Sequence, residues 1–88
     1  MEIKITGTIF SIGETQTVGE KGFKKRQLVV TTSENYPQNL PIEFTQDKCA
    51  VLDNYLEGQS VTVGINLRGS EYNGRHYLSA QGWKIQGV

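Results

Sequence analysis

Apolar side chains recur at every second residue along much of this chain. The clearest case is Ser60–Arg68, where Val61, Val63, Ile65 and Leu67 alternate with polar residues and one glycine. Successive side chains of a β-strand point to opposite faces, so this period predicts a strand with one buried face. Valine, isoleucine and threonine together number 22, whereas alanine occurs twice. Because β-branched side chains lose rotamer freedom in helices, an all-α fold is excluded.

Four further segments have the character of strands. They are Glu2–Ile12, Phe23–Thr32, Leu40–Thr45 and Arg75–Ile85. Between the first two, Gly13–Gly22 holds three glycines and a single apolar residue, which predicts a long flexible hairpin loop. The chain therefore offers five short strands.

Two other connections carry residues typical of turns. Ser33–Pro41 contains asparagines and prolines, which favour a turn after the second strand. Asn73-Gly74 is the strongest two-residue hairpin signal, because both central positions of a type I′ turn need positive φ. We therefore expect the last two strands to form a tight hairpin.

One segment, Gln46–Leu56, is helical in pattern. Cys49, Leu52 and Leu56 fall at i, i+3 and i+7 and form a narrow apolar stripe, and Gly58 follows as a C-terminal stop. The order is three strands, a helix and two strands. That is the order of the OB-fold, a five-stranded Greek-key barrel whose helix plugs one end. We expect residues 1–88 to form one such domain.

Several positions are expected to build the interior of this barrel. The apolar phase of the first strand changes from Ile9 to Phe10 and Ile12, as a β-bulge produces, and Gly7 permits a bend. Inward-facing positions of the later strands follow from alternation. The expected core residues also include Leu28, Val30, Leu40, Ile42, Phe44, Tyr55 and Trp83, with Phe10 among them.

Several function classes have little support in the sequence. No apolar run approaches the ~18 residues that cross a bilayer, and the start does not resemble a signal peptide. We therefore expect a cytoplasmic protein without membrane contact. The single cysteine, Cys49, and the single histidine, His76, do not make a metal site. No set of nucleophile, base and orienting residue is visible, so we expect neither an enzyme nor a cofactor.

The formal net charge is zero, but the charge is unevenly distributed. The only basic cluster comprises Lys21, Lys24, Lys25 and Arg26, at the start of the second strand. In an OB-fold the second and third strands and the adjoining loops make the nucleic-acid face. The cluster is therefore a candidate for phosphate contacts. The alternative is a solvated hairpin end whose charge keeps a strand edge from pairing with other chains.

Aromatic residues lie close to these cations. Phe23 adjoins the basic cluster on the phase opposite the core residues, and Tyr77 has an outward phase on the last strand. Tyr72 and Arg75 flank the predicted turn and face each other across the hairpin. They are suited either to stacking on nucleic-acid bases or to a cation–π interaction with each other that involves no ligand.

The second half of the chain resembles a known family. The similarity lies in Phe44-Thr45, Leu52, Tyr55-Leu56-Glu57-Gly58-Gln59-Ser60-Val61-Thr62-Val63, Leu67-Arg68 and Tyr72-Asn73-Gly74-Arg75-His76-Tyr77. In order and spacing these residues resemble the bacterial single-stranded-DNA-binding proteins. The resemblance implies an OB-fold, homo-oligomers and stacking of bases on aromatic side chains, with Tyr72 and Tyr36 as stacking residues. The chain is also similar to a group of short bacterial proteins of unknown function.

These observations predict a protein that binds single-stranded nucleic acid, DNA in the first place and RNA as a further option, without sequence preference. Arg68 and Arg75 would join the basic cluster in following the phosphates. One domain of this size has a short footprint, so we expect a homodimer or homotetramer. Replication, recombination or repair is the expected setting. The alternative is an OB-fold interaction module without a nucleic-acid ligand, which the zero net charge favours.

Overall fold

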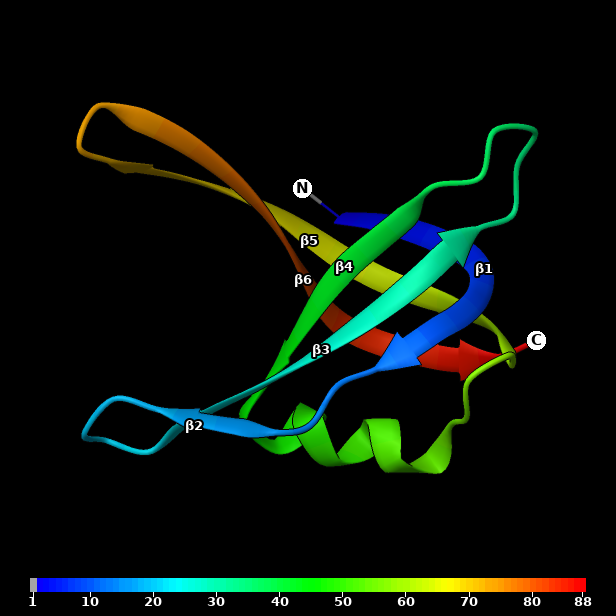
Figure 1. The fold of residues 1–88 in the computed structure, drawn as a ribbon, viewed down its shortest axis with the longest axis horizontal. Coiled ribbons are helices and arrows are strands. Elements are labelled where there is room, and N and C mark those ends of the chain that lie inside the picture. Colours follow the sequence, from blue (N-terminus) through cyan, green and yellow to red (C-terminus); the bar gives the residue numbers. More distant parts are fainter. Residues whose placement is uncertain (1) are drawn as a thin grey trace.

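Five long strands close into a ring in the computed structural model, which describes residues 2–88 (Figure 1). The elements in chain order are β1 (Glu2–Ile12), β2 (Gln16–Val18), β3 (Phe23–Thr32), β4 (Asn39–Thr45), the 3₁₀ helix η1 (Gln46–Asn54), β5 (Ser60–Tyr72) and β6 (Arg75–Gly87). Around the ring β1 pairs with β3 and β5, β5 with β6, and β4 with β3. The ring closes where β4 and β6 run parallel and pair through Glu43 and Gln81. This confirms the predicted OB-fold barrel.

Strand β1 bends so that it can pair on both sides. Gly7 pairs with Val61 of β5 and with Thr32 of β3. A Cβ atom at Gly7 would lie 2.1 Å from the carbonyl oxygen of Thr31, so only glycine permits this close approach. The predicted bend at Gly7 is therefore explained by contact between strands.

The predicted phase change in β1 is correct, but the predicted place of Phe10 is wrong. Ile9 pairs with Val30 and Ser11 pairs with Val29, so Phe10 is the extra residue of a β-bulge. Its side chain is 60% exposed, whereas Ile9 is buried. The bulge turns Phe10 outward, and Ile12 after it packs against the core again.

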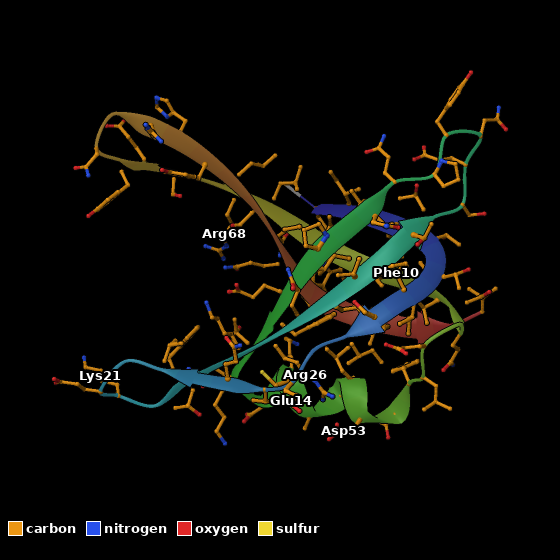
Figure 2. The ribbon with its side chains drawn as sticks, in the orientation of Figure 1. Phe10, Glu14, Lys21, Arg26, Asp53 and Arg68 are labelled. Atoms are coloured by element: carbon orange, nitrogen blue, oxygen red, sulfur yellow. The ribbon has the colours of Figure 1, made fainter. Side chains whose placement is uncertain are left out.

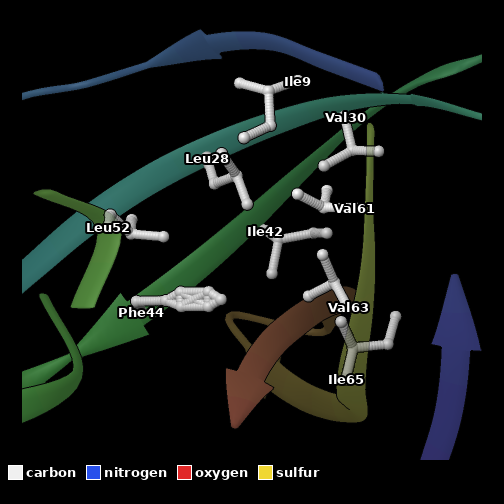
Figure 3. Close-up of a cluster of buried hydrophobic side chains, with 9 residues drawn as sticks. All are labelled: Ile9, Leu28, Val30, Ile42, Phe44, Leu52, Val61, Val63 and Ile65. Carbon is white, nitrogen blue, oxygen red and sulfur yellow. The ribbon is translucent and has the colours of Figure 1, made fainter. Parts of the chain in front are cut away.

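The core lies inside the ring and consists of alternating side chains from β1, β3, β4 and β5 together with one from η1 (Figure 3). Its buried members are Ile9, Leu28, Val30, Ile42, Phe44, Leu52, Val61, Val63 and Ile65. Strand β6 contributes a glycine, because a Cβ atom at Gly82 would lie 2.2 Å from the ring of Phe44. Alternation thus predicted the buried residues of β3 and β5 correctly, together with Ile42 and Phe44 of β4, whereas Leu40, which was also expected in the core, is only half-buried and lies outside the core cluster.

The helix lies where the sequence placed it, but it is shorter and of a tighter type. In a 3₁₀ helix residues i and i+3 share one side, and Cys49 and Leu52 are buried together beneath the barrel. The chain becomes extended at Tyr55, whose hydroxyl donates to the carbonyl oxygen of Ile85 at 3.1 Å. Leu56 therefore leaves the stripe and is 76% exposed, so its predicted burial is wrong.

Trp83 does not enter the core cluster, contrary to the sequence-based expectation. A register shift lets Gly64 pair with Lys84 while Ile65 pairs with Gly82, which leaves Trp83 as the unpaired residue of a bulge. Its indole is half-buried and lies against Gly64, where a Cβ atom would be 2.9 Å from the ring. The bulge thus moves the ring out of the interior.

Two hairpins project beyond the barrel toward the same side (Figure 1). In the β2–β3 arm, residues 16–25, β2 pairs with the first residues of β3, so the predicted loop contains a short strand. In the β5–β6 arm, residues 67–80, the two strands pair with each other beyond the last β1 contact at Asn66. Its turn has φ of 52° at Asn73 and 77° at Gly74, which confirms the predicted turn.

Along residues 2–88, no helix has the length and apolar content that crossing a membrane requires.

Candidate nucleic-acid interface

A groove of about 400 Å³ lies between the two arms. Its floor is the outer face of β3 and β4, with Gln27, Pro41 and Glu43. One side is formed by the β2–β3 arm, including Lys25, and the other by the edge of β6 at Leu78–Ala80. The groove is therefore open to solvent and lined by polar and apolar groups together.

The β5–β6 arm carries its predicted site residues on a single face. Cross-strand partners share a face, and faces repeat at every second residue. All four candidates therefore lie on one side of the arm. Tyr72 pairs with Arg75, Tyr77 follows two residues after Arg75, and Arg68 precedes Tyr72 by four residues and pairs with Ser79. Tyr72 is 70% and Tyr77 is 50% exposed. Figure 2 shows the Arg68 side chain on the side of the arm that is turned toward the β2–β3 arm.

The cations of the β2–β3 arm lie on two faces. Lys25 follows the outward phase of Phe23, which is 40% exposed. Lys24 lies on the other face, close enough to Cys49 for its charge to act on that thiol. Lys21 lies in the turn at the tip of the arm (Figure 2). In the described residues, none of these three lysines has an ion-pair partner.

Arg26 is held by contacts within the protein. Its Nε donates to the carbonyl oxygen of Gly13 at 2.7 Å, and its Nη1 donates to the carbonyl oxygen of Cys49 at 3.1 Å and to Oδ1 of Asp53 at 2.7 Å. The side chain is only 15% exposed. Alternation places Arg26 on the face of Leu28, and although Arg26 also lines one end of the groove, its guanidinium is engaged by these protein contacts. It therefore fixes the base of the β2–β3 arm to η1.

The contacts of Arg26 surround a buried thiol. Sγ of Cys49 donates weakly to the carbonyl oxygen of Phe44 at 3.4 Å. Burial raises the pKa of the Cys49 thiol, and the nearby positive charge of Arg26 opposes this effect in part. A thiol in this setting behaves as a small apolar side chain.

Tyr36 is not brought to the groove. It lies in the connection between β3 and β4, residues 33–38, and is 86% exposed. Figure 1 shows this connection at the opposite end of the molecule from the two arms. The structure therefore separates Tyr36 from Tyr72 and Tyr77.

The sequence reasoning missed the polar floor of the groove. Gln27 and Glu43 are cross-strand partners on the outer face, and Gln81 is the partner of Glu43 on β6. Their outward phase follows from the same alternation that identified the core. Their proximity depends on the pairing between strands, which the sequence pattern alone does not give.

Comparison with known proteins places the fold in context. A family model described as "Domain of unknown function (DUF3127)" matches residues 4–86. No curated protein sequence matches the chain. The fold is similar to that of the mitochondrial single-stranded DNA-binding protein Rim1 of S. cerevisiae, with a TM-score of 0.84 and 17% identity over 100% of this chain and 95% of that chain.

Two further crystal structures are similar in fold. The single-stranded DNA-binding protein of Thermus aquaticus has a TM-score of 0.77 and 10% identity over 99% of this chain and 40% of that chain. The SSB domain of a Synechococcus protein has a TM-score of 0.74 and 12% identity over 96% of this chain and 91% of that chain. The predicted resemblance to this fold is therefore confirmed in structure.

Proposed function

Because the chain belongs to the family described as Domain of unknown function (DUF3127) and has an OB-fold, we propose that it binds single-stranded DNA without strong sequence preference. The observation that carries this proposal is the groove between the arms, beside a hairpin face with two exposed tyrosines and two arginines. OB-folds bind oligonucleotides at this place, between the corresponding loops.

The proposed contacts divide into two kinds. Tyr72, Tyr77 and Phe23 stack on bases, each worth about 1–3 kcal/mol per base. The cations that face solvent contact phosphates and displace counterions. They are Lys21, Lys24, Lys25, Arg68 and Arg75. Arg26 acts indirectly, by holding the β2–β3 arm. Tyr36 contacts only a strand that is long enough to wrap around the barrel.

Stacking has to supply a large share of the affinity. The net charge is zero, and Glu14 and Glu43 line the groove together with Lys25. Carboxylates repel phosphates, so the positive side chains of the arms act against a local negative contribution. We therefore expect a modest dependence of affinity on salt and a strong dependence on the aromatic rings.

More than one copy is part of the proposal. A single groove contacts few nucleotides, and linked copies on one strand raise the overall affinity without new contacts. We propose a homodimer or homotetramer that acts on DNA in replication, recombination or repair, with RNA as a weaker ligand. Native mass spectrometry gives the number of copies directly, and a purely monomeric protein at micromolar concentration contradicts this part.

Fluorescence anisotropy with a labelled oligo-dT at low salt tests the binding itself. Lys25→Glu, at a lysine that lines the groove, is expected to weaken binding and to reduce the salt slope by roughly 0.7 for the lost phosphate contact. Tyr72→Ala is expected to weaken binding with the slope unchanged. Lys84→Glu, the same charge reversal on β6 outside both arms, serves as the control. Absence of binding at low salt overturns the proposal.

An interaction module without a nucleic-acid ligand is the second candidate. The observation in its favour is Leu78, which is 73% exposed at the edge of the groove in a protein of zero net charge. Such a module would leave oligo-dT unbound and would tolerate both substitutions in that assay. The anisotropy measurement therefore separates the two candidates.

A further inference from the structure

Three polar side chains form a row, of which two lie on the floor of the groove and the third lies beside it on β6. Gln27 of β3 pairs with Glu43 of β4, and Glu43 pairs with Gln81 of β6. All three have the outward phase, because Leu28, Phe44 and Gly82 next to them face the core. Side chains of paired residues on one face are direct neighbours. The carboxylate of Glu43 therefore stands between two amides where β3, β4 and β6 meet.

The polar atoms of this row are free for a ligand. Within residues 2–88, no side-chain hydrogen bond or ion pair engages Gln27, Glu43 or Gln81. Gln27 and Glu43 line the groove directly. Gln27 is exposed, whereas Glu43 and Gln81 are half-buried, and half-buried polar groups that meet a ligand favour the partner that completes their hydrogen bonds.

The charge of the row determines which part of a strand it suits. The row contains one carboxylate and no cation, so it repels phosphates. The groups that can contact phosphates, Lys25 and Arg68, lie at the sides of the groove. A strand bound with its phosphates along the arms would turn its bases toward the floor.

Base edges differ in how they match a carboxylate. The amino group of cytosine donates to carboxylate oxygens, and glutamine amides donate to and accept from neighbouring base atoms. Uracil and thymine have one N3–H donor between two carbonyl oxygens, and these oxygens face any carboxylate that approaches. Glu43 therefore favours bases with an amino group on the pairing edge.

We propose that Glu43, with Gln27 and Gln81 beside it, gives this groove a preference for amino-bearing bases, cytosine over uracil and thymine. The inference rests on the proposed function and adds a bias to binding that otherwise tolerates any sequence. Stacking alone does not produce this bias, because cytosine and uracil present similar pyrimidine faces.

Anisotropy with oligo-dC and oligo-dU of equal length tests the proposal, at slightly alkaline pH where cytosine is unprotonated. These oligonucleotides differ only on the pairing edge, where cytosine has an amino group at C4 and an acceptor at N3, and uracil has a carbonyl group at C4 and an N–H donor at N3. The wild-type protein is expected to bind oligo-dC at least about fivefold more tightly, the lower end for one specific base contact. This comparison needs no variant.

The variant Glu43→Gln assigns the preference to the residue. Its amide can donate to the C4 carbonyl of uracil, so the ratio of the two affinities is expected to fall to about one. Glu57→Gln makes the same charge change at an exposed position outside the groove and is expected to keep the wild-type ratio. Melting curves verify that both variants are folded.

Each outcome is informative. Equal affinity of the wild-type protein for oligo-dC and oligo-dU overturns the base preference and leaves the proposed function intact. A preference that persists in Glu43→Gln overturns the assignment to Glu43. Absence of binding to either oligonucleotide overturns the proposed function and this inference with it.

Discussion

Nη1 of Arg26 lies 2.7 Å from Oδ1 of Asp53, and through this pair β3 is joined to the helix beneath the barrel. The same guanidinium also binds the carbonyl oxygens of Gly13 and Cys49. Arg26 therefore links the base of the β2–β3 arm, the end of the core and η1. A cation that the sequence placed among the phosphate contacts has a structural role here.

Replacing Arg26 with methionine is expected to lower the free energy of unfolding by about 1–3 kcal/mol, because the carbonyl oxygens that it bridges lose a charged donor. Asp53→Asn is expected to cost less than about 1 kcal/mol, since Asp53 is largely exposed. Urea titration measures both. Arg75→Met on the β5–β6 arm is the control, and equal losses for the two arginines contradict the structural role.

Gly82 is expected to tolerate no side chain. A Cβ atom there would lie 2.2 Å from the ring of Phe44, so Gly82→Ala should cost about 3 kcal/mol by overpacking. At Gly69 the nearest neighbour of a Cβ atom is 4.0 Å away, and Gly69→Ala should be neutral or stabilising by about 0.5 kcal/mol. Thermal and urea unfolding distinguish the two, and similar effects at both positions count against the observed packing.

The two phenylalanines that the sequence assigned to the core should behave differently. Phe44→Ala is expected to lower the free energy of unfolding by about 3–5 kcal/mol, because it leaves a cavity. Phe10→Ala should cost about 1 kcal/mol or less, because its side chain is 60% exposed. Chemical denaturation measures both losses. Equal losses would contradict the bulge that turns Phe10 outward.

The Cys49 thiol should couple stability to alkaline pH. Burial raises its pKa in the folded protein above the ordinary value of 9.0, so the folded state holds the thiol proton more tightly than the unfolded state. This contribution is fully present below the unfolded pKa and is lost as the pH rises through the folded pKa. Urea titrations above pH 9 are expected to show that the free energy of unfolding falls more steeply with pH for the wild type than for Cys49→Ala. An equal fall in both proteins contradicts the raised pKa of Cys49.

The two faces of the β5–β6 arm should differ in DNA binding. Tyr77→Ala is expected to weaken oligo-dT binding by about 1–3 kcal/mol for the lost stacking. His76→Ala, next in sequence but on the opposite face, is expected to leave the affinity unchanged. Anisotropy titrations of both variants give the result. Equal losses would show that the arm does not present one face to the strand.

The sequence predicted the barrel because alternation is a local property. Leu28, Ile42 and Val63 could be assigned to the core from their neighbours in the chain alone. Phe10 and Trp83 could not, since each lies in a bulge whose position depends on the partner strand. The predicted burial of Leu56 was wrong because the 3₁₀ helix ends at Asn54, before it reaches Leu56.

The candidate site was predictable only in part. The turn at Asn73 and the pattern around it identified the β5–β6 arm, and the register shows that its candidates share a face. The floor formed by Gln27 and Glu43 comes from strands that are distant in the sequence. Which cation is free, Lys25 or Arg26, depends on Asp53, which lies 27 residues from Arg26.

The barrel closes through one residue pair, Glu43 with Gln81, whereas its other seams are long ladders. Local fluctuations open a structure first where the fewest hydrogen bonds hold it. The contact between β4 and β6 is thus the part of the barrel that is expected to open most easily, and its residue Glu43 lines the groove. Separation of β4 from β6 would widen the groove for a larger ligand, while the hydrogen bonds between the other strands stay intact.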